Sequence, residues 1–123
     1  MGKKIKITWL SKPEAHDYPA ALSYLSLIYD EKTAARYVRR LKGVRMSAFK
    51  SKDIFRASGL SSLGVGNFHV EKDRKKIRLK NKLSPILLVR DGKIGRVIIA
   101  DGYHRLCAAY SFDEDANIPC KIV

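Results

Sequence analysis

The segment at residues 97–110 constrains the fold more than any other part of the chain. An apolar run rich in β-branched residues ends in Asp101-Gly102, and a helix-forming run begins two residues later. This order predicts a strand, a tight turn and a helix. Because a short strand and an apolar helix must bury their faces against other elements, we expect an α+β domain. In it, helices would surround a small mixed sheet.

The junction between the predicted strand and helix is suited to an anion. The first N–H groups of a helix lack partners within the helix and carry partial positive charge. Gly102 would let an anion approach closely, and His104 and Arg105 would add donors. Alternatively the turn is purely structural, with Asp101 capping the helix and Gly102 taking a positive φ. We expect loss of Arg105 to weaken phosphate binding and to leave folding largely intact. The predicted phosphate-binding residues are Gly102, Tyr103, His104, Arg105, Lys72 and Lys76.

The charge of the chain is strongly unbalanced. Its 123 residues, enough for one domain, include 25 Lys and Arg against 12 Asp and Glu, a net charge of +13. The basic residues concentrate in two blocks, at residues 32–56 and 71–82. Such blocks favour a polyanionic partner, nucleic acid above membrane, although a merely basic surface or a small phosphorylated ligand is the alternative. A nucleic acid would require both blocks on one continuous face. The residues predicted to contact it are Arg36, Arg39, Arg40, Arg45, Lys50 and Lys52.

Neither a membrane segment nor a cysteine-based site is indicated. The chain shows no signal-peptide pattern, and its apolar runs are too short to span a bilayer, so we expect a cytoplasmic protein. Cys107 and Cys120 have no metal-ligand spacing. They are expected to be buried, reduced thiols.

Local patterns predict the other elements. Alternation of apolar and polar residues at 5–9 suits a short first strand. Asp30 is placed to cap a helix that Gly43 ends, and Ser51 to cap the next. A Gly- and Ser-rich stretch at 58–67 predicts an irregular loop. The expected helices are 18–29, 31–42, 50–58, 71–80 and 104–110, and the expected later strands are 85–90, 96–100 and 118–123.

From His69 onward the sequence resembles the ParB/sulfiredoxin superfamily. A Lys-bearing helix precedes Leu-Ser-Pro-Ile, which leads into a strand. A hairpin follows, then Asp-Gly-Tyr-His-Arg opens a helix, and Pro-Cys-Lys-Ile-Val closes the chain. The chain also looks like uncharacterised bacterial proteins that share the IADGYHR turn. The resemblance implies a core at residues 69–123 with an N-terminal helical part at 1–68. It also implies that the turn binds the phosphate of a nucleotide or nucleic acid.

One departure from that superfamily limits the chemistry. Sulfiredoxins carry a catalytic cysteine immediately before His-Arg, and Tyr103 stands there instead. A phenol with a pKa near 10 cannot replace a low-pKa thiolate, so we expect no sulfinate reduction. Kinases of this fold use an acidic base, for which Asp101 or Glu71 is available.

Two functions are compatible with these features. The first is non-catalytic binding of nucleotide or nucleic-acid phosphate at the 101–105 turn. The alternative is a small nucleotide-dependent phosphoryl-transfer or hydrolytic enzyme, in which Asp101 holds a Mg²⁺ ion brought by the phosphates. His16, His69 and Glu71 are the candidates for positioning its nucleophile.

Overall fold

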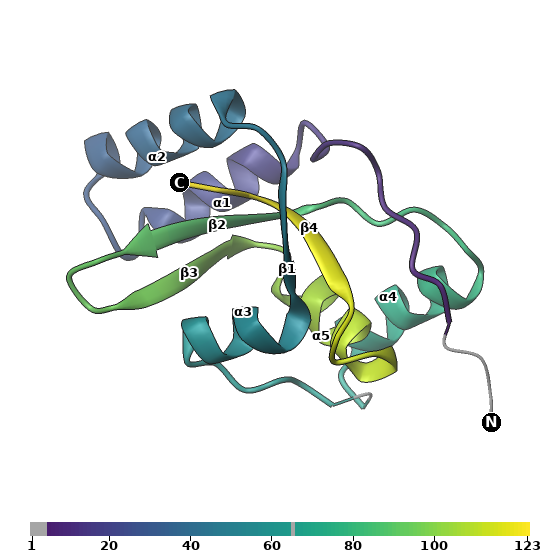
Figure 1. Ribbon diagram of the computed structural model, residues 1–123. Coiled ribbons are helices and arrows are strands. Elements are labelled where there is room, and N and C mark those ends of the chain that lie inside the picture. The colour runs from purple at the N-terminus through teal and green to yellow at the C-terminus, as the bar shows by residue number, and fades with distance from the viewer. Residues whose placement is uncertain (1–4, 65) are drawn as a thin grey trace.

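A four-stranded mixed sheet runs through the middle of the molecule, and helices cover both of its faces (Figure 1). The computed structural model describes residues 5–64 and 66–123. The predicted α+β class is confirmed. In chain order the elements are α1 (Asp17–Leu25), α2 (Glu31–Gly43), β1 (Ser47–Lys50), α3 (Ser51–Ser58), α4 (Phe68–Arg78), β2 (Ile86–Asp91), β3 (Arg96–Asp101), α5 (Tyr103–Phe112) and β4 (Asn117–Ile122).

The sheet has the strand order β1-β4-β2-β3. β2 and β3 form an antiparallel hairpin, β4 runs parallel to β2, and β1 is antiparallel to β4. The chain passes through α5 between β3 and the parallel strand β4, as parallel pairing requires a crossover. The first turn of α5 therefore lies at the end of β3, directly beyond Asp101.

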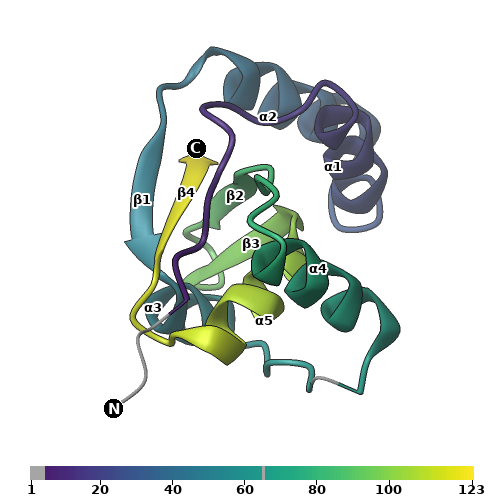
Figure 2. The same ribbon diagram turned by 90° about the vertical axis from the view of Figure 1, so that its right-hand side faces the viewer.

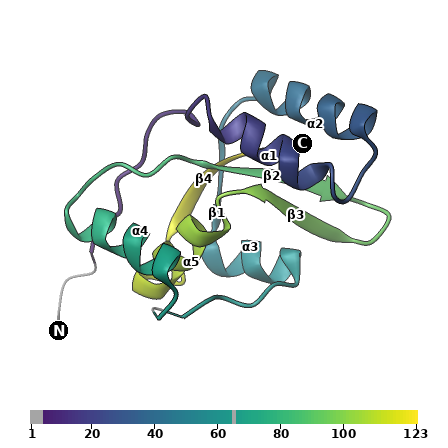
Figure 3. The same ribbon diagram turned by 180° about the vertical axis from the view of Figure 1, so that it is seen from behind.

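The two faces of the sheet bury separate cores (Figure 3). On one face, α1 and α2 supply Leu25 and Leu41, which cluster with Leu87 of β2. On the other face, α3, α4 and α5 pack on the sheet, and Leu88 belongs to their cluster. Neighbouring residues of β2 point to opposite faces, because side chains alternate along a strand. A strand buried on both faces must be apolar throughout, which explains the Ile-Leu-Leu-Val run.

The strands expected at 85–90, 96–100 and 118–123 are confirmed within one or two residues. Asp30 caps α2 as predicted, accepting a hydrogen bond from the N–H of Thr33 (2.8 Å). The described part of the 58–67 stretch contains no strand and is helical only at Ser58; residue 65 lies outside the described residues.

The strand expected at residues 5–9 is wrong. Trp9 forms only an isolated parallel bridge with Leu83, and Ile5 is exposed. The sheet is completed instead by β1, which pairs with the outer edge of β4 and was not predicted. Because β1 comes from the part of the chain before residue 69, that part is not purely helical.

Two helix boundaries differ from expectation by three residues or more, and one predicted cap is absent. The first helix ends at Leu25, earlier than predicted. α4 begins at Phe68, because the side chain of Asn67 caps its first turn. Ser51 does not cap α3, because its hydroxyl donates instead to the carbonyl of Glu114 (2.6 Å).

Two expectations drawn from the composition can be compared with the fold. No helix within the described ranges is long and apolar enough to cross a membrane. Cys107 and Cys120 are buried and free, as predicted. Burial raises the pKa of the Cys120 thiol to about 11, so this thiol stays protonated and unreactive at neutral pH.

Candidate functional site

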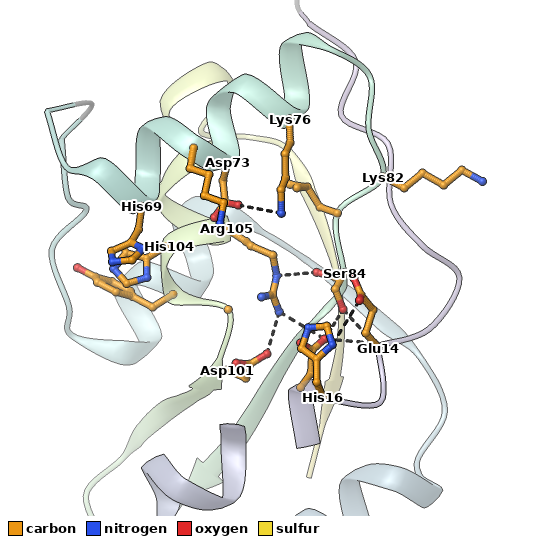
Figure 4. A pocket seen from close by; sticks show the side chains of 15 residues that line it. Glu14, His16, His69, Asp73, Lys76, Lys82, Ser84, Asp101, His104 and Arg105 are labelled. Carbon is orange, nitrogen blue, oxygen red and sulfur yellow. Dashed lines mark hydrogen bonds and ion pairs between the residues drawn. The ribbon is translucent and has the colours of Figure 1, made fainter. Parts of the chain in front are cut away.

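A polar hollow of about 240 Å³ opens where the starts of α5 and α1 approach α4 (Figure 4). All residues predicted to bind phosphate line this hollow, and so do all three histidines of the chain. The fold thus gathers side chains that are far apart in the sequence into one place. The predicted residues that line it are Gly102, Tyr103, His104, Arg105, Lys72, Lys76, Asp101, His16 and His69.

Gly102 forms the turn that opens α5. Its φ of 107° lies in the left-handed region, which glycine adopts at little cost, as predicted. No side chain of the described residues caps α5, so the prediction that Asp101 caps it is wrong. Asp101 instead accepts a hydrogen bond from Nη2 of Arg105 (2.9 Å). The N–H groups of the first turn therefore remain available to an anion in the hollow.

The guanidinium of Arg105 is held mainly by the protein. Nε donates to the carbonyl of Ser84 (2.8 Å), and Nη2 donates to that of Pro85 (3.2 Å). Nη2 also pairs with Asp101 and lies 3.8 Å from Asp17. Only 18% of the Arg105 side chain is exposed. Our expectation that its loss would spare folding is therefore revised, because two carboxylates would lose their cationic partner.

Asp17 and Asp101 form an acidic pair beside Arg105. Asp17 is buried and accepts hydrogen bonds from the Ser84 hydroxyl and the N–H of Glu14. Burial raises the pKa of Asp101, Arg105 partly offsets this rise, and Asp17 adds to it. Asp101 therefore holds a proton more readily than an exposed carboxyl would.

The opposite side of the hollow is cationic. Lys72 and Lys76 lie one helical turn apart on α4, and Asp73 lies 3.9 Å from the ammonium of Lys76. The ring of His104 lies against that of His69, with centroids 4.8 Å apart. Burial, and then the neighbouring His69, hold the pKa of His104 below its ordinary value, whereas Asp73 opposes this shift. The neutral form of the His104 imidazole is thus favoured over the charged form.

The other two candidates for positioning a nucleophile differ in placement. His16 lines the hollow, with Nδ1 3.5 Å from Glu14 and Nε2 3.4 Å from Asp17. Glu71 is not among the residues that line it, and its carboxylate pairs with Arg78 (2.6 Å). His16 thus stays a candidate by position, and Glu71 does not.

No family model, curated protein or solved structure matches the chain. The ParB/sulfiredoxin resemblance therefore stays a prediction from the motif. The described residues also contain no cluster of three or more His, Cys, Asp or Glu that could hold a metal ion.

The structure does not bring the predicted nucleic-acid residues together. Those on α2 lie on one side of the sheet, whereas Lys52 lies on α3 at the other side, paired with Asp115 (2.7 Å). Helix α1, which carries no lysine or arginine, lies between α2 and α4 (Figures 2 and 3). The α2 part of the first basic block is therefore separated from the block on α4, whereas its α3 part lies on the same side of the sheet as α4. The residues concerned are Arg36, Arg39, Arg40, Arg45, Lys50 and Lys52.

Sequence reasoning missed several residues of the site. It assigned no contact to Asp17 or Ser84, although these two side chains bond to each other beside Arg105. Asp73 was read as one charge within a basic block, yet it is buried. The sequence offered only a weak signal for these contacts. The Ser84-Pro85 step before β2 supplies the carbonyls to which Arg105 donates, but no local sequence pattern indicates that Arg105 is their partner.

Proposed function

We propose that the hollow binds the phosphate group of a nucleotide or a related small phosphorylated molecule. The observation that carries this proposal is the meeting of the uncapped first turn of α5 with lysine and imidazole side chains, four of them on α4 and α5, in one hollow. Helix N-termini and lysines are common donors to phosphate oxygens. The resemblance of the Asp-Gly-Tyr-His-Arg turn to phosphate-binding turns supports the same ligand class. The four side chains are Lys72, Lys76, His69 and His104.

The distribution of charge favours a small ligand over a polymer. A nucleic acid needs consecutive phosphate contacts along its backbone, and α2, which carries Arg36, Arg39 and Arg40, lies across the sheet from the lysines of α4. Nucleic-acid phosphate is the alternative ligand. It would show itself by affinity that falls steeply with salt and by tighter binding of longer strands.

Removing one lysine of the hollow should weaken phosphate binding. We expect Lys72→Met or Lys76→Met to lower the affinity for pyrophosphate and ATP by about tenfold, the loss of roughly one charge-assisted hydrogen bond. Isothermal titration calorimetry measures this. Lys75→Met is the matched control, because Lys75 is exposed on the same helix and does not line the hollow. Equal losses in all three variants would place the ligand elsewhere.

Anion binding should strengthen as the pH falls. The pKa of His104 lies below 6.5, mainly because of burial, and a bound anion favours its protonated form. The affinity for sulfate, which does not titrate near neutrality, should therefore rise as the pH drops below 6.5. His104→Gln should flatten part of that rise. A pH profile unchanged by His104→Gln would show that this imidazole does not meet the anion.

An enzymatic role is the second candidate, and Asp101 is the observation that favours it. A carboxyl whose pKa is raised by burial, at the edge of a polar hollow, is a common feature of catalytic sites. A Mg²⁺ ion brought by the phosphates would find this carboxylate already hydrogen-bonded to Arg105. Phosphate release from ATP with Mg²⁺, lost in Asp101→Asn, would favour the enzyme over the binding protein.

A further inference from the structure

A row of four rings leads from the hollow to the surface of the molecule. The ring centroids of Tyr103 and His104 are 5.6 Å apart, those of His104 and His69 are 4.8 Å apart, and those of His69 and Phe68 are 5.5 Å apart. The first three rings line the hollow. Phe68 continues the row outward. The rings therefore form one connected surface that begins where we place the phosphate.

Each ring of this row is attached to a fixed part of the backbone. Phe68 and His69 occupy the first turn of α4, which the side chain of Asn67 caps. Tyr103 and His104 occupy the first turn of α5, and the hydroxyl of Tyr103 donates to the carbonyl of Ser61 (2.5 Å). Two helix starts thus fix the backbone that carries the rings before any ligand binds, which lowers the entropy lost on binding.

Packing in the hydrophobic core does not account for the position of Phe68. Phe68 is 75% exposed, and it belongs to neither core cluster of the described residues. Its ring meets His69 at 76°, edge to face, so much of its surface is left open. A single exposed apolar residue is common on any protein. This one, however, ends a row of rings that starts inside a polar hollow.

We propose that the row formed by Phe68, His69, His104 and Tyr103 is a stacking platform for a nucleobase. The inference rests on the proposed function, because the phosphate of the same ligand would occupy the hollow. Every nucleobase presents a flat π-surface that stacks on aromatic rings, largely independently of its identity. Phe68 supplies the open ring, and His69 and His104 connect it to the phosphate donors. The ligand is therefore a mononucleotide rather than a phosphorylated sugar or inorganic phosphate.

Calorimetry with matched probes tests this assignment. The probes are the four common ribonucleoside 5′-monophosphates and ribose 5-phosphate, which shares their phosphate and sugar but lacks the base. We expect at least one monophosphate to bind about tenfold more tightly than ribose 5-phosphate, the usual order of one stacked base. Phe68→Ala should abolish that difference and leave ribose 5-phosphate binding unchanged, whereas Phe68→Trp should keep it. Leu27→Ala is the control, because Leu27 is also a highly exposed apolar residue but does not line the hollow.

The outcomes separate the platform from the phosphate site. Equal binding of the monophosphates and ribose 5-phosphate by the unmodified protein would overturn the platform and leave the proposed function standing. A loss for both kinds of probe in Phe68→Ala would overturn it too. If neither probe binds, the proposed function and the inference that rests on it both fail. A Phe68 effect seen with a single-stranded oligonucleotide but with no monophosphate would overturn the assignment to a mononucleotide.

Discussion

Gly102→Ala should destabilise the domain by about 3 kcal/mol or more, through a strained φ of about 1–3 kcal/mol and overpacking of about 1–3 kcal/mol. The φ of 107° disfavours any residue with a β-carbon. An added Cβ would also lie 2.3 Å from Cγ2 and 2.8 Å from Cβ of Ile86, a fully buried residue of β2 that cannot move aside freely. The free energy of unfolding, measured by chemical denaturation, checks this expectation.

Two other glycines separate the causes of that loss. Gly95 has a positive φ of 66° but no atom within 4 Å of an added Cβ, so Gly95→Ala reports the backbone strain alone. Gly92 has neither a positive φ nor a close neighbour, so Gly92→Ala should change stability little. If Gly102→Ala loses no more stability than Gly95→Ala, then the Ile86 side chain moves aside, and overpacking does not contribute to the loss.

Arg105→Ala should destabilise the fold by about 3–5 kcal/mol at neutral pH, the range for breaking a buried ion pair from one side. The change removes the hydrogen bonds to the carbonyls of Ser84 and Pro85, and it leaves Asp17 and Asp101 without their cation. Denaturation at several pH values checks both the size and the origin of the loss.

The sign of the pH dependence follows from Asp101. Burial already raises the pKa of this carboxyl above its ordinary 3.8. Such a group stabilises the fold most below its unfolded pKa, and the benefit is lost as the pH rises through its folded pKa. Without Arg105 that pKa rises further, so the deficit of Arg105→Ala relative to the unmodified protein should shrink as the pH falls towards 3.8.

A surface arginine provides the matched control for this variant. Arg78 pairs with Glu71 on the exposed side of α4, and Arg78→Ala should cost less than about 1 kcal/mol, as exposed ion pairs do. If Arg105→Ala keeps full stability and loses only phosphate affinity, then Arg105 is a ligand-binding residue and not the anchor described here.

Much of the sheet could be predicted from the sequence because its signals are local. The β-branched runs of β2 and β3, the Gly-containing turn between them and the Asp-Gly step before α5 each act within a few residues. The same local chemistry indicated Gly102 at positive φ, and all residues predicted to bind phosphate do line one hollow. The platform ring of Phe68 escaped notice because Asn67, which starts α4 there, was read as part of a loop.

By itself, the sequence determined the hairpin and the strand-turn-helix segment, because backbone preference and side-chain periodicity are set by near neighbours. Only the tertiary structure decided that β1 rather than residues 5–9 completes the sheet, since an edge position accepts whichever segment the packing delivers. The tertiary structure also decided that the guanidinium of Arg105 binds mainly to the protein. Whether a guanidinium faces a ligand or the protein depends on distant acceptors, here Asp17 and Ser84, whose approach no local pattern in the chain encodes.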